Sequence, residues 1–332
     1  MIQGVILAAG KGKRLKPVTL KVSKAMSPIL DKPIIGHVLE CLHLAVGIRD
    51  FVVVVSTEDK DICDYLESQW RDRAQFRFAY QDRRMGMADA LMHAVPYIDG
   101  EEFLLAACDN LHRKEHIAEL VHCHREFGNN GTLSLMRVPP EKLSKGGVVE
   151  IIDGEISRIV EKPDPEDAPS DMASLPLYVF RREILEYLPH VGLSPRGEYE
   201  LQDAMQMMIN EHGGFRGVIT DARFSLTSVQ DLLDINAHYL DEHLPPDSAT
   251  PQAMGKGSVI EPPVFLGHNV VLGDGCRIGP YVVIGNDSCI GDGCDIKHSV
   301  VFEGTTLEAG VKVQDWVLFD GIPKADEADN GS

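Results

Sequence analysis

Residues suited to holding phosphate are concentrated near the start of the chain. The string LAAGKGKRLKPVT, from Leu7 to Thr19, follows a short apolar run and contains two glycines among several cations. Glycines allow backbone N–H groups to turn toward an anion, and an arginine such as Arg14 can bind two phosphate oxygens at once. The first 24 residues include six Lys or Arg and no Asp or Glu. The pattern predicts an anion-binding loop, although its spacing fits neither the Walker phosphate loop nor the dinucleotide fingerprint.

A second candidate is the acid in Cys108-Asp109-Asn110, which directly follows the apolar run FLLAA. Ligands of mostly parallel sheets bind at the carboxyl ends of strands. Asp109 therefore lies where a ligand is expected to bind. Taken alone, an acid at this place could equally cap the helix that follows.

The elements that must position these residues alternate between apolar strands and helices. This alternation favours an α/β fold with a Rossmann-like, mostly parallel sheet covered on both faces. From about residue 146 the regular alternation of strands and helices no longer holds. Asp153-Gly154 lies between two apolar runs and predicts a hairpin in an antiparallel flap. Strands are expected at 5–8, 51–55, 76–80, 103–107, 133–138 and 175–180, and helices at 33–46, 59–70, from 87, 114–127, 181–188 and 200–211.

The last third of the chain repeats with a period of six. Glycine follows five members of an aliphatic series: Ile260, Leu266, Leu272, Ile278, Ile284, Ile290 and Ile296. An aliphatic residue followed by glycine at this period is typical of the hexapeptide left-handed parallel β-helix. The chain is thus expected to comprise an α/β domain (1–242), a linker (243–258), a β-helix (259–320) and a disordered tail (321–332).

Bulk composition excludes several classes of protein. The net charge of -19 argues against a nucleic-acid binder, which would present a basic face. No apolar run approaches the roughly 20 residues needed to span a bilayer, and the N-terminus lacks the order of a secretory signal. The seven cysteines are scattered without a CxxC pair. A cytoplasmic protein without nucleic-acid or membrane partners is expected.

Taken together, the motifs resemble those of the sugar-1-phosphate nucleotidyltransferases, also called nucleotide-sugar pyrophosphorylases, and among them glucose-1-phosphate thymidylyltransferases. The hexapeptide β-helix is a common appendage in that family. The resemblance rests on motifs in the family's order across residues 1–240: LAAGKGKRLKPVT, Lys24, Asp31-Lys32-Pro33, QDRRMGMADA from Gln81, Cys108-Asp109-Asn110, GVVE from Gly147, Glu161-Lys162-Pro163, and RGEYELQD from Arg196.

The resemblance implies a reaction and a role for each matching residue. A nucleoside triphosphate, with dTTP or UTP favoured by Gln81 and Gly86, would react with a sugar 1-phosphate in the presence of Mg²⁺. Nucleotide-binding residues would be Leu7, Ala8, Ala9, Gly10, Lys11, Gly12, Lys13, Arg14, Gln81 and Gly86. Sugar-binding residues would be Gly147, Glu161, Lys162 and Arg196; the catalytic set would be Arg14, Lys24, Asp109 and Lys162, with Asp109 on the metal. Self-association through the β-helix is also expected.

Two departures from the family pattern leave alternatives open. Ser225 stands where many relatives have a second magnesium-binding Asp, with Asp221 and Asp231 nearby, and Pro176 stands where many have a glycine beside the sugar. The serine would suit a non-catalytic regulatory subunit that binds nucleotide sugar. A bifunctional enzyme with an acyltransferase β-helix would need an exposed catalytic histidine, for which His268 and His298 are the candidates.

Overall fold

The computed structural model describes residues 2–244, 248 and 250–320, so the predicted tail at 321–332 and part of the predicted linker lie outside the described residues. The contacts divide the chain into two compact units, and each is considered by itself. The first unit comprises residues 1–11, 23–25 and 35–225, and the second comprises 12–22, 26–34 and 226–332.

The first unit is built on a sheet whose parallel part matches the predicted strands. β1 (Gln3–Leu7) lies between β4 (Asp50–Val55) and β6 (Glu102–Ala107), and β5 (Gln75–Tyr80) extends the sheet beyond β4. All three pairings are parallel. The apolar runs are almost entirely buried because both faces of the sheet are covered, as expected for parallel strands.

The antiparallel part of the same sheet forms the predicted flap. The strands are β8 (Gly131–Arg137), β9 (Gly147–Ile152), β10 (Glu155–Glu161), β11 (Met172–Arg181) and β12 (Phe215–Ile219). β11 runs antiparallel to β6, β8 and β9, while β12 is parallel to β8. The predicted turn between β9 and β10 is confirmed, with φ of 51° at Asp153 and 82° at Gly154, the conformation of a tight hairpin turn.

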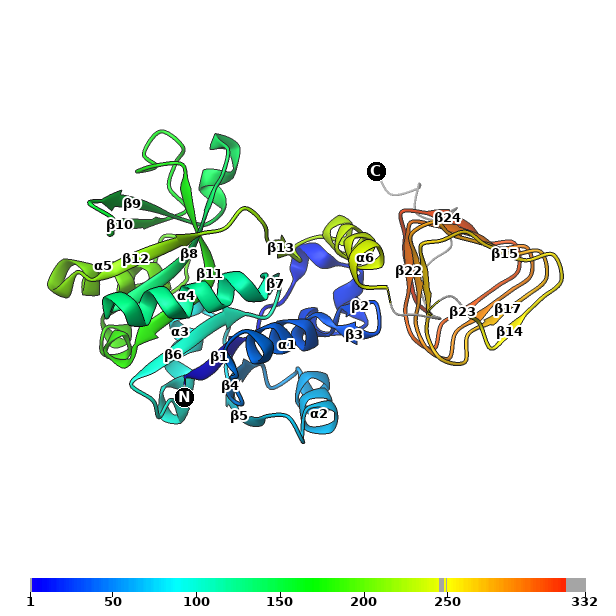
Figure 1. The fold of residues 1–332 in the computed structure, drawn as a ribbon, viewed down its shortest axis with the longest axis horizontal. Coiled ribbons are helices and arrows are strands. Elements are labelled where there is room, and N and C mark those ends of the chain that lie inside the picture. The colour runs from blue at the N-terminus through cyan, green and yellow to red at the C-terminus, as the bar shows by residue number, and fades with distance from the viewer. Residues whose placement is uncertain (1, 245–247, 249, 321–332) are drawn as a thin grey trace. The chain divides into compact units, whose positions relative to one another are not determined.

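Helices cover both faces of this sheet (Figure 1). One buried cluster joins α3 (Met87–Ala94) and α5 (Leu201–His212) to every second residue of the central strands, including Leu133 and Leu135 of β8. Thr132 and Ser134 therefore face the other side, where they bond to histidines of α4 (Lys114–Phe127). The unit also contains nearly all of α1 (Ile34–Val46), together with α2 (Lys60–Gln69).

One predicted helix is wrong in type. The segment 181–188 forms two 3₁₀ turns, at Arg182–Glu186 and Leu188–His190. Pro189 removes a backbone N–H and disfavours helical geometry at the residue before it, so a regular α-helix cannot continue there. The other 3₁₀ turns are Lys13–Leu15, Val18–Leu20, Lys24–Met26, Val95–Tyr97 and Pro140–Lys145.

The second unit contains a helix that holds a short hairpin. β2 (Pro28–Ile29) and β3 (Lys32–Pro33) pair antiparallel, and α6 (Val229–His243) packs against β2. Asn236 of α6 accepts a hydrogen bond from the Leu30 N–H at 2.9 Å and donates one to the Pro28 carbonyl at 3.0 Å. A capping box of Ser228 and Asp231 satisfies the N-terminus of α6.

The same unit contains the predicted left-handed parallel β-helix. Its three sheets each hold four parallel strands in the described residues. The strands are β14 (Ala253–Met254), β15 (Val259–Ile260), β16 (Val264–Leu266), β17 (Val271–Leu272), β18 (Arg277–Ile278), β19 (Val282–Ile284), β20 (Cys289–Ile290), β21 (Asp295–Lys297), β22 (Ser299–Val301), β23 (Thr306–Leu307), β24 (Lys312–Gln314) and β25 (Val317–Leu318). β14 begins inside the segment expected to be a linker.

The six-residue period fixes the register of the coils. Ile260, Ile278 and Ile296 stack in one column, 18 residues apart, and the last two are fully buried. After Ile296 the step shortens to 17 residues, since Ile284 pairs with Val301, which explains the loss of strict spacing in the sequence. Gly279 has a φ of 114°, and a Cβ there would lie 1.9 Å from the Glu261 carbonyl oxygen, so this corner requires glycine.

Within the described part of the chain, no helix combines the length and the apolar character that crossing a bilayer requires.

Truncating a buried aliphatic side chain of the β-helix should destabilise the domain far more than truncating the exposed side chain beside it. Ile278→Ala leaves a cavity in the stacked column and should lower the free energy of unfolding by about 2–5 kcal/mol. Arg277→Ala, on the exposed side of the same strand, should change it by no more than about 0.5 kcal/mol. Urea unfolding followed by circular dichroism measures both, and equal effects would contradict the stacked-column arrangement.

Candidate active site

The candidate site lies at the carboxyl ends of β1 and β6. Asp109 follows β6, and the Cys108 N–H donates to the Leu7 carbonyl at 3.1 Å, which ties the end of β6 to the end of β1. The loop that leaves β1 is fixed at its first residue, since the Ala8 N–H donates to the Val54 carbonyl at 2.8 Å. The predicted anion loop and the predicted metal ligand therefore start from adjacent strands.

Asp109 is bonded at both carboxylate oxygens. Its Oδ2 accepts from the Lys24 ammonium, and its Oδ1 accepts from Asn110 Nδ2 at 2.7 Å. The side chains of Lys24 and Asp109 are only 13% and 19% exposed. The structure thus brings together two predicted catalytic residues separated by 85 positions in the sequence.

Asn110 and Arg223 are site residues that the sequence reasoning did not assign. β7 (Asn110–Leu111) pairs antiparallel with β13 (Phe224–Ser225), which places Ser225 opposite Asn110, the residue after Asp109. Arg223 Nη1 donates to Asn110 Oδ1 at 3.1 Å. The available signal was the position of Asn110 directly after Asp109, whereas nothing in the sequence links Arg223 to it.

The two acids considered as substitutes for a second metal ligand are engaged elsewhere. Asp231 accepts from the N–H groups of Thr227 and Ser228, each at 2.8 Å, as part of the cap of α6. Asp221 lies 3.8 Å from Arg113 and is exposed. In the described residues, no group of three or more His, Cys, Asp or Glu side chains could hold a metal ion.

The predicted anion loop is divided between the two units. Ala8, Ala9, Gly10 and Lys11 belong to the first, whereas Gly12, Lys13 and Arg14 belong to the second. A Cβ added at Gly10 would meet no atom within 4 Å, so this backbone is open to a ligand. The roles predicted for Gly12, Lys13 and Arg14 remain predictions.

Gln81 and Gly86 form one hydrogen-bonded turn. Gln81 is 3% exposed, and its Nε2 donates to Asp89 Oδ2 at 2.6 Å and to the Gly86 carbonyl at 3.3 Å. Gly86 has a φ of 109°, and a Cβ there would lie 2.5 Å from the Tyr199 carbonyl oxygen. Glycine is therefore required by the backbone at position 86, and reading of a base by these residues remains a prediction.

The Gly86 turn is joined to the segment that carries Arg196. The Tyr199 N–H donates to the Met85 carbonyl at 2.6 Å, and the Tyr199 carbonyl accepts from the Ala88 N–H at 3.0 Å. Arg196 Nη2 donates to Glu200 Oε1 at 2.9 Å, and Glu200 is itself buried. Backbone hydrogen bonds thus join a segment predicted to bind the nucleotide to a segment predicted to bind the sugar.

Gly147, Glu161 and Lys162 meet at the open end of the hairpin. Gly147 and Glu161 are register partners in β9 and β10, and a Cβ at Gly147 would lie 3.3 Å from Glu161 Oε2. Lys162 Nζ lies 3.3 Å from Glu161 Oε1, whereas Oε2 is buried without a partner in the described residues. The predicted sugar residues of this hairpin therefore lie together around an acceptor oxygen.

Burial raises the pKa of Glu161, and this is opposed chiefly by the neighbouring Lys162 ammonium. Glu200 raises the pKa further and Arg196 lowers it, which places the Arg196–Glu200 pair within electrostatic reach of Glu161. The three charged residues among the predicted sugar-binding set, Glu161, Lys162 and Arg196, accordingly form one electrostatic group.

Pro176 is accommodated by an irregularity in β11. The register of β11 with β8 shifts between Leu175 and Tyr178, so Pro176 sits in a bulge where no ladder N–H is needed. The proline is consistent with the sheet, and its effect on a sugar remains a prediction.

Residues 3–242 match the family model described as Nucleotidyl transferase, and residues 259–320 match one described as the GMPPB C-terminal domain. The chain belongs to the nucleotidyl transferase family. The family predicted from the sequence motifs is therefore confirmed, and the protein is a nucleotidyltransferase.

Similar proteins include UTP–glucose-1-phosphate uridylyltransferase AglF of Haloferax volcanii, 32% identical over 209 residues that cover 63% of this chain and 84% of the relative. UTP–glucose-1-phosphate uridylyltransferase of Streptococcus pneumoniae is 28% identical over 272 residues, covering 73% and 91%. A solved structure of UDP-glucose pyrophosphorylase complexed with UDP-glucose superposes with a TM-score of 0.66 at 23% identity, over 73% of this chain and 100% of that chain. That superposition confirms the fold of the nucleotidyltransferase unit.

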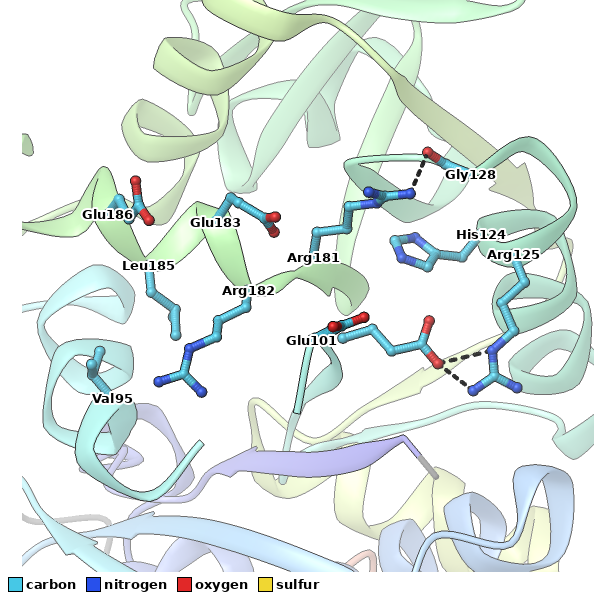
Figure 2. A pocket seen from close by; sticks show the side chains of 11 residues that line it. Val95, Glu101, His124, Arg125, Gly128, Arg181, Arg182, Glu183, Leu185 and Glu186 are labelled. Atoms are coloured by element: carbon cyan, nitrogen blue, oxygen red, sulfur yellow. Dashed lines mark hydrogen bonds and ion pairs between the residues drawn. The ribbon is translucent and has the colours of Figure 1, made fainter. Parts of the chain in front are cut away.

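A cavity of about 730 Å³ lies elsewhere in the same unit, near the amino end of β6 (Figure 2). Glu102 begins β6 and Asp109 follows its other end, so this cavity lies at the edge of the sheet away from the candidate site. Arg125 is paired with Glu102, and Arg181 and Arg182 donate to the carbonyls of Gly128 and Ile98. Its arginines are thus engaged by the protein itself.

Replacing Glu161 with glutamine should change how stability depends on pH. Because burial raises the Glu161 pKa, the folded state binds its proton more tightly, and the free energy of unfolding falls as pH rises through that pKa. Glu161→Gln removes this fall, so the variant should gain stability relative to the parent protein as the pH is raised above about 4.5, the ordinary pKa of a glutamate. The measurement is urea unfolding at several pH values.

The exposed Glu141→Gln is the matched control and should show no such gain. A stability difference for Glu161→Gln that stays constant with pH, or shrinks as pH rises, would contradict the shifted pKa.

Proposed function

We propose that the protein is a sugar-1-phosphate nucleotidyltransferase, which joins a nucleoside triphosphate to a hexose 1-phosphate and releases pyrophosphate. The observation that carries this proposal is the Lys24–Asp109 pair at the carboxyl ends of β1 and β6, beside the open loop that starts at Ala8. Two similar proteins are named as UTP–glucose-1-phosphate uridylyltransferases. UTP with glucose 1-phosphate is therefore the first substrate pair to test, and dTTP is the alternative nucleotide.

The residues of the site suit a reaction between two phosphates. The phosphate oxygen of the sugar attacks the α-phosphorus in line, a new P–O bond forms, and the bond to the pyrophosphate oxygen breaks. Since the nucleophile is already an anion, catalysis needs alignment and charge neutralisation rather than a general base. Lys24 supplies positive charge where these anions would meet, and it does so from a largely buried position.

A covalent enzyme intermediate is not needed, and the nearest thiol is unsuited to one. Cys108 precedes Asp109 and is buried; burial, reinforced by the Asp109 carboxylate, raises the pKa of its thiol. The thiol therefore stays neutral, and the neutral form is a weak nucleophile.

The donor set fits Mg²⁺ with a single protein carboxylate. Asp109 offers hard oxygens and is partly exposed, and Mg²⁺ commonly takes one or two carboxylates together with phosphate oxygens and water. When bound, the ion would help to neutralise the negative charge of the phosphates. Asp109 would hold it, and Lys24 would then be released to contact phosphate.

The hairpin residues form the sugar side of the proposed site. Glu161 Oε2, which is buried and without a partner in the part of the chain described, could accept from a sugar hydroxyl. Lys162 and Arg196 are cations close to it and suit the sugar phosphate. Gly147 keeps the approach to Glu161 free of a side chain.

Three further expectations belong to this proposal. The protein would act in the cytoplasm, self-associate through its β-helix, and divide at the predicted boundaries of 242, 258 and 320. Ser225 motivates the alternative of a regulatory subunit, which would bind nucleotide sugar without turnover.

The purified protein should release pyrophosphate from UTP or dTTP with glucose 1-phosphate and Mg²⁺. Asp109→Asn should lower kcat by about 100-fold or more, because the ion loses its only proposed protein carboxylate. Asp171→Asn, an exposed acid paired with Arg137, is the control and should retain activity. A coupled pyrophosphate assay over a panel of triphosphates and sugar phosphates makes the measurement, and no turnover anywhere in the panel would favour the regulatory subunit.

Removing Lys24 should improve the binding of free metal while it damages turnover. The ammonium occupies Asp109 Oδ2, so Lys24→Met frees an oxygen and should tighten Mn²⁺ binding without nucleotide by about 10-fold. Electron paramagnetic resonance of unbound Mn²⁺ measures the affinity. The exposed Lys142→Met should leave it unchanged, and adding Asp109→Asn to Lys24→Met should abolish the gain. Equal Mn²⁺ affinity in the parent protein and Lys24→Met would overturn this competition.

A further inference from the structure

A line of side chains runs from Arg223 to the candidate metal ligand. Arg223 Nη1 donates to Asn110 Oδ1 at 3.1 Å, and Asn110 Nδ2 donates to Asp109 Oδ1 at 2.7 Å. The two ends of the line are 114 positions apart in the sequence. The pairing of β7 with β13 brings them together, with Phe224 opposite Leu111 and Ser225 opposite Asn110.

We propose that Arg223 is a positioning residue of the nucleotidyltransferase site: acting through Asn110, it holds Asp109 Oδ1 and leaves Oδ2 as the oxygen that would bind the metal. This inference rests on the proposed function, which it deepens by naming the side chain that holds the single metal-binding carboxylate in place.

The argument begins with the orientation of the Asn110 amide. An asparagine has one accepting oxygen and one donating nitrogen, and a half-turn of the amide exchanges them. With Arg223 on one side and Asp109 on the other, the exchanged orientation would set NH₂ against a guanidinium and an oxygen against a carboxylate. Both contacts would be repulsive, so Arg223 fixes which end of Asn110 faces Asp109.

Burial makes this constraint effective. Asn110 is 5% exposed, so water cannot readily replace either of its bonds, and a buried bond to a charged group is stronger than one in water. The guanidinium also polarises the amide and strengthens its donation to the carboxylate. Asp109 Oδ1 is held in place as a result, while Oδ2 contacts the displaceable ammonium of Lys24.

Two groups near the Arg223–Asn110 bond carry no charge at neutral pH. His112 is buried, and burial together with the nearby His116 and Arg223 lowers its pKa to about 3, so it is neutral at neutral pH. Ser225, opposite Asn110, is an uncharged hydroxyl. No carboxylate at position 225 therefore competes with Asn110 for the guanidinium.

The test compares Arg223→Gln with Arg223→Lys and with Arg216→Gln. Arg216 lies on β12, pairs with Glu155 and stacks over Phe127, so it controls for the loss of a half-buried arginine in the same unit. Two readouts are used. One is the affinity for Mn²⁺ with a methylene-bridged UTP analogue, measured by paramagnetic resonance without turnover, and the other is kcat and KM with UTP and glucose 1-phosphate.

Arg223→Gln should weaken binding of the Mn²⁺–analogue complex and lower kcat, each by about 10–100-fold, with KM for the sugar phosphate unchanged. Arg223→Lys keeps a cationic donor and should recover most of both losses. Arg216→Gln should change neither. Asn110→Leu, which keeps a side chain branched at Cγ, should match Arg223→Gln, and the double variant should be no worse than either single one because the two act in series.

The proposal is overturned if Arg223→Gln leaves metal–analogue affinity unchanged, if Arg223→Lys is as impaired as Arg223→Gln, or if the losses of Arg223→Gln and Asn110→Leu simply add. Failure of the proposed function is seen separately. A parent protein that never releases pyrophosphate defeats the function, whereas the binding readout still decides the role of Arg223.

Discussion

The pairing of a cation from the N-terminal segment with the acid after β6 is the interaction on which the site depends. Lys24 and Asp109 are both largely removed from water, and each alone would be costly to bury. As a pair the two charges can be buried, because each offsets the other. Each of them can also exchange its partner for another group of opposite charge. A triphosphate and a divalent ion bring such groups, since the ammonium can turn to phosphate and the carboxylate to metal. Without a ligand, the charges of the pair cancel at the place where the proposed function puts the charged substrates.

This local balance explains how a chain with a net charge of -19 can suit anionic substrates. Long-range repulsion between exposed charges is screened over about 10 Å at moderate ionic strength, whereas interactions between partly buried groups within the site are screened much less. Lys24, Lys162, Arg196 and Arg223 each lie beside a specific acceptor rather than on a broad basic face. The net charge of the chain therefore says little about the local charge at a binding site.

Much of the fold could be predicted because local pattern determines it. Buried strands such as Asp50–Val55 and the rungs at Ile278 and Ile296 are written directly into apolar runs and a fixed period. The site was predicted only in part. Lys24, Asp109 and Glu161 were found by resemblance, but the bond between Arg223 and Asn110 depends on a pairing between segments far apart in sequence, which no local pattern encodes. The 3₁₀ turns around Pro189 were missed because the helical spacing of apolar residues does not reveal that a backbone N–H is absent.

The backbone hydrogen bonds at Tyr199 restrict how the two segments that they join can move. Two hydrogen bonds join Tyr199 to Met85 and Ala88, and the space beside Gly86 is too small even for a methyl group. The Gly86 turn and the chain around Tyr199 are therefore expected to move together, because the hydrogen bonds join them and the close packing at Gly86 opposes a relative displacement. Under the proposed function, a nucleotide that displaced the Gln81 turn would therefore also displace the segment that carries Arg196.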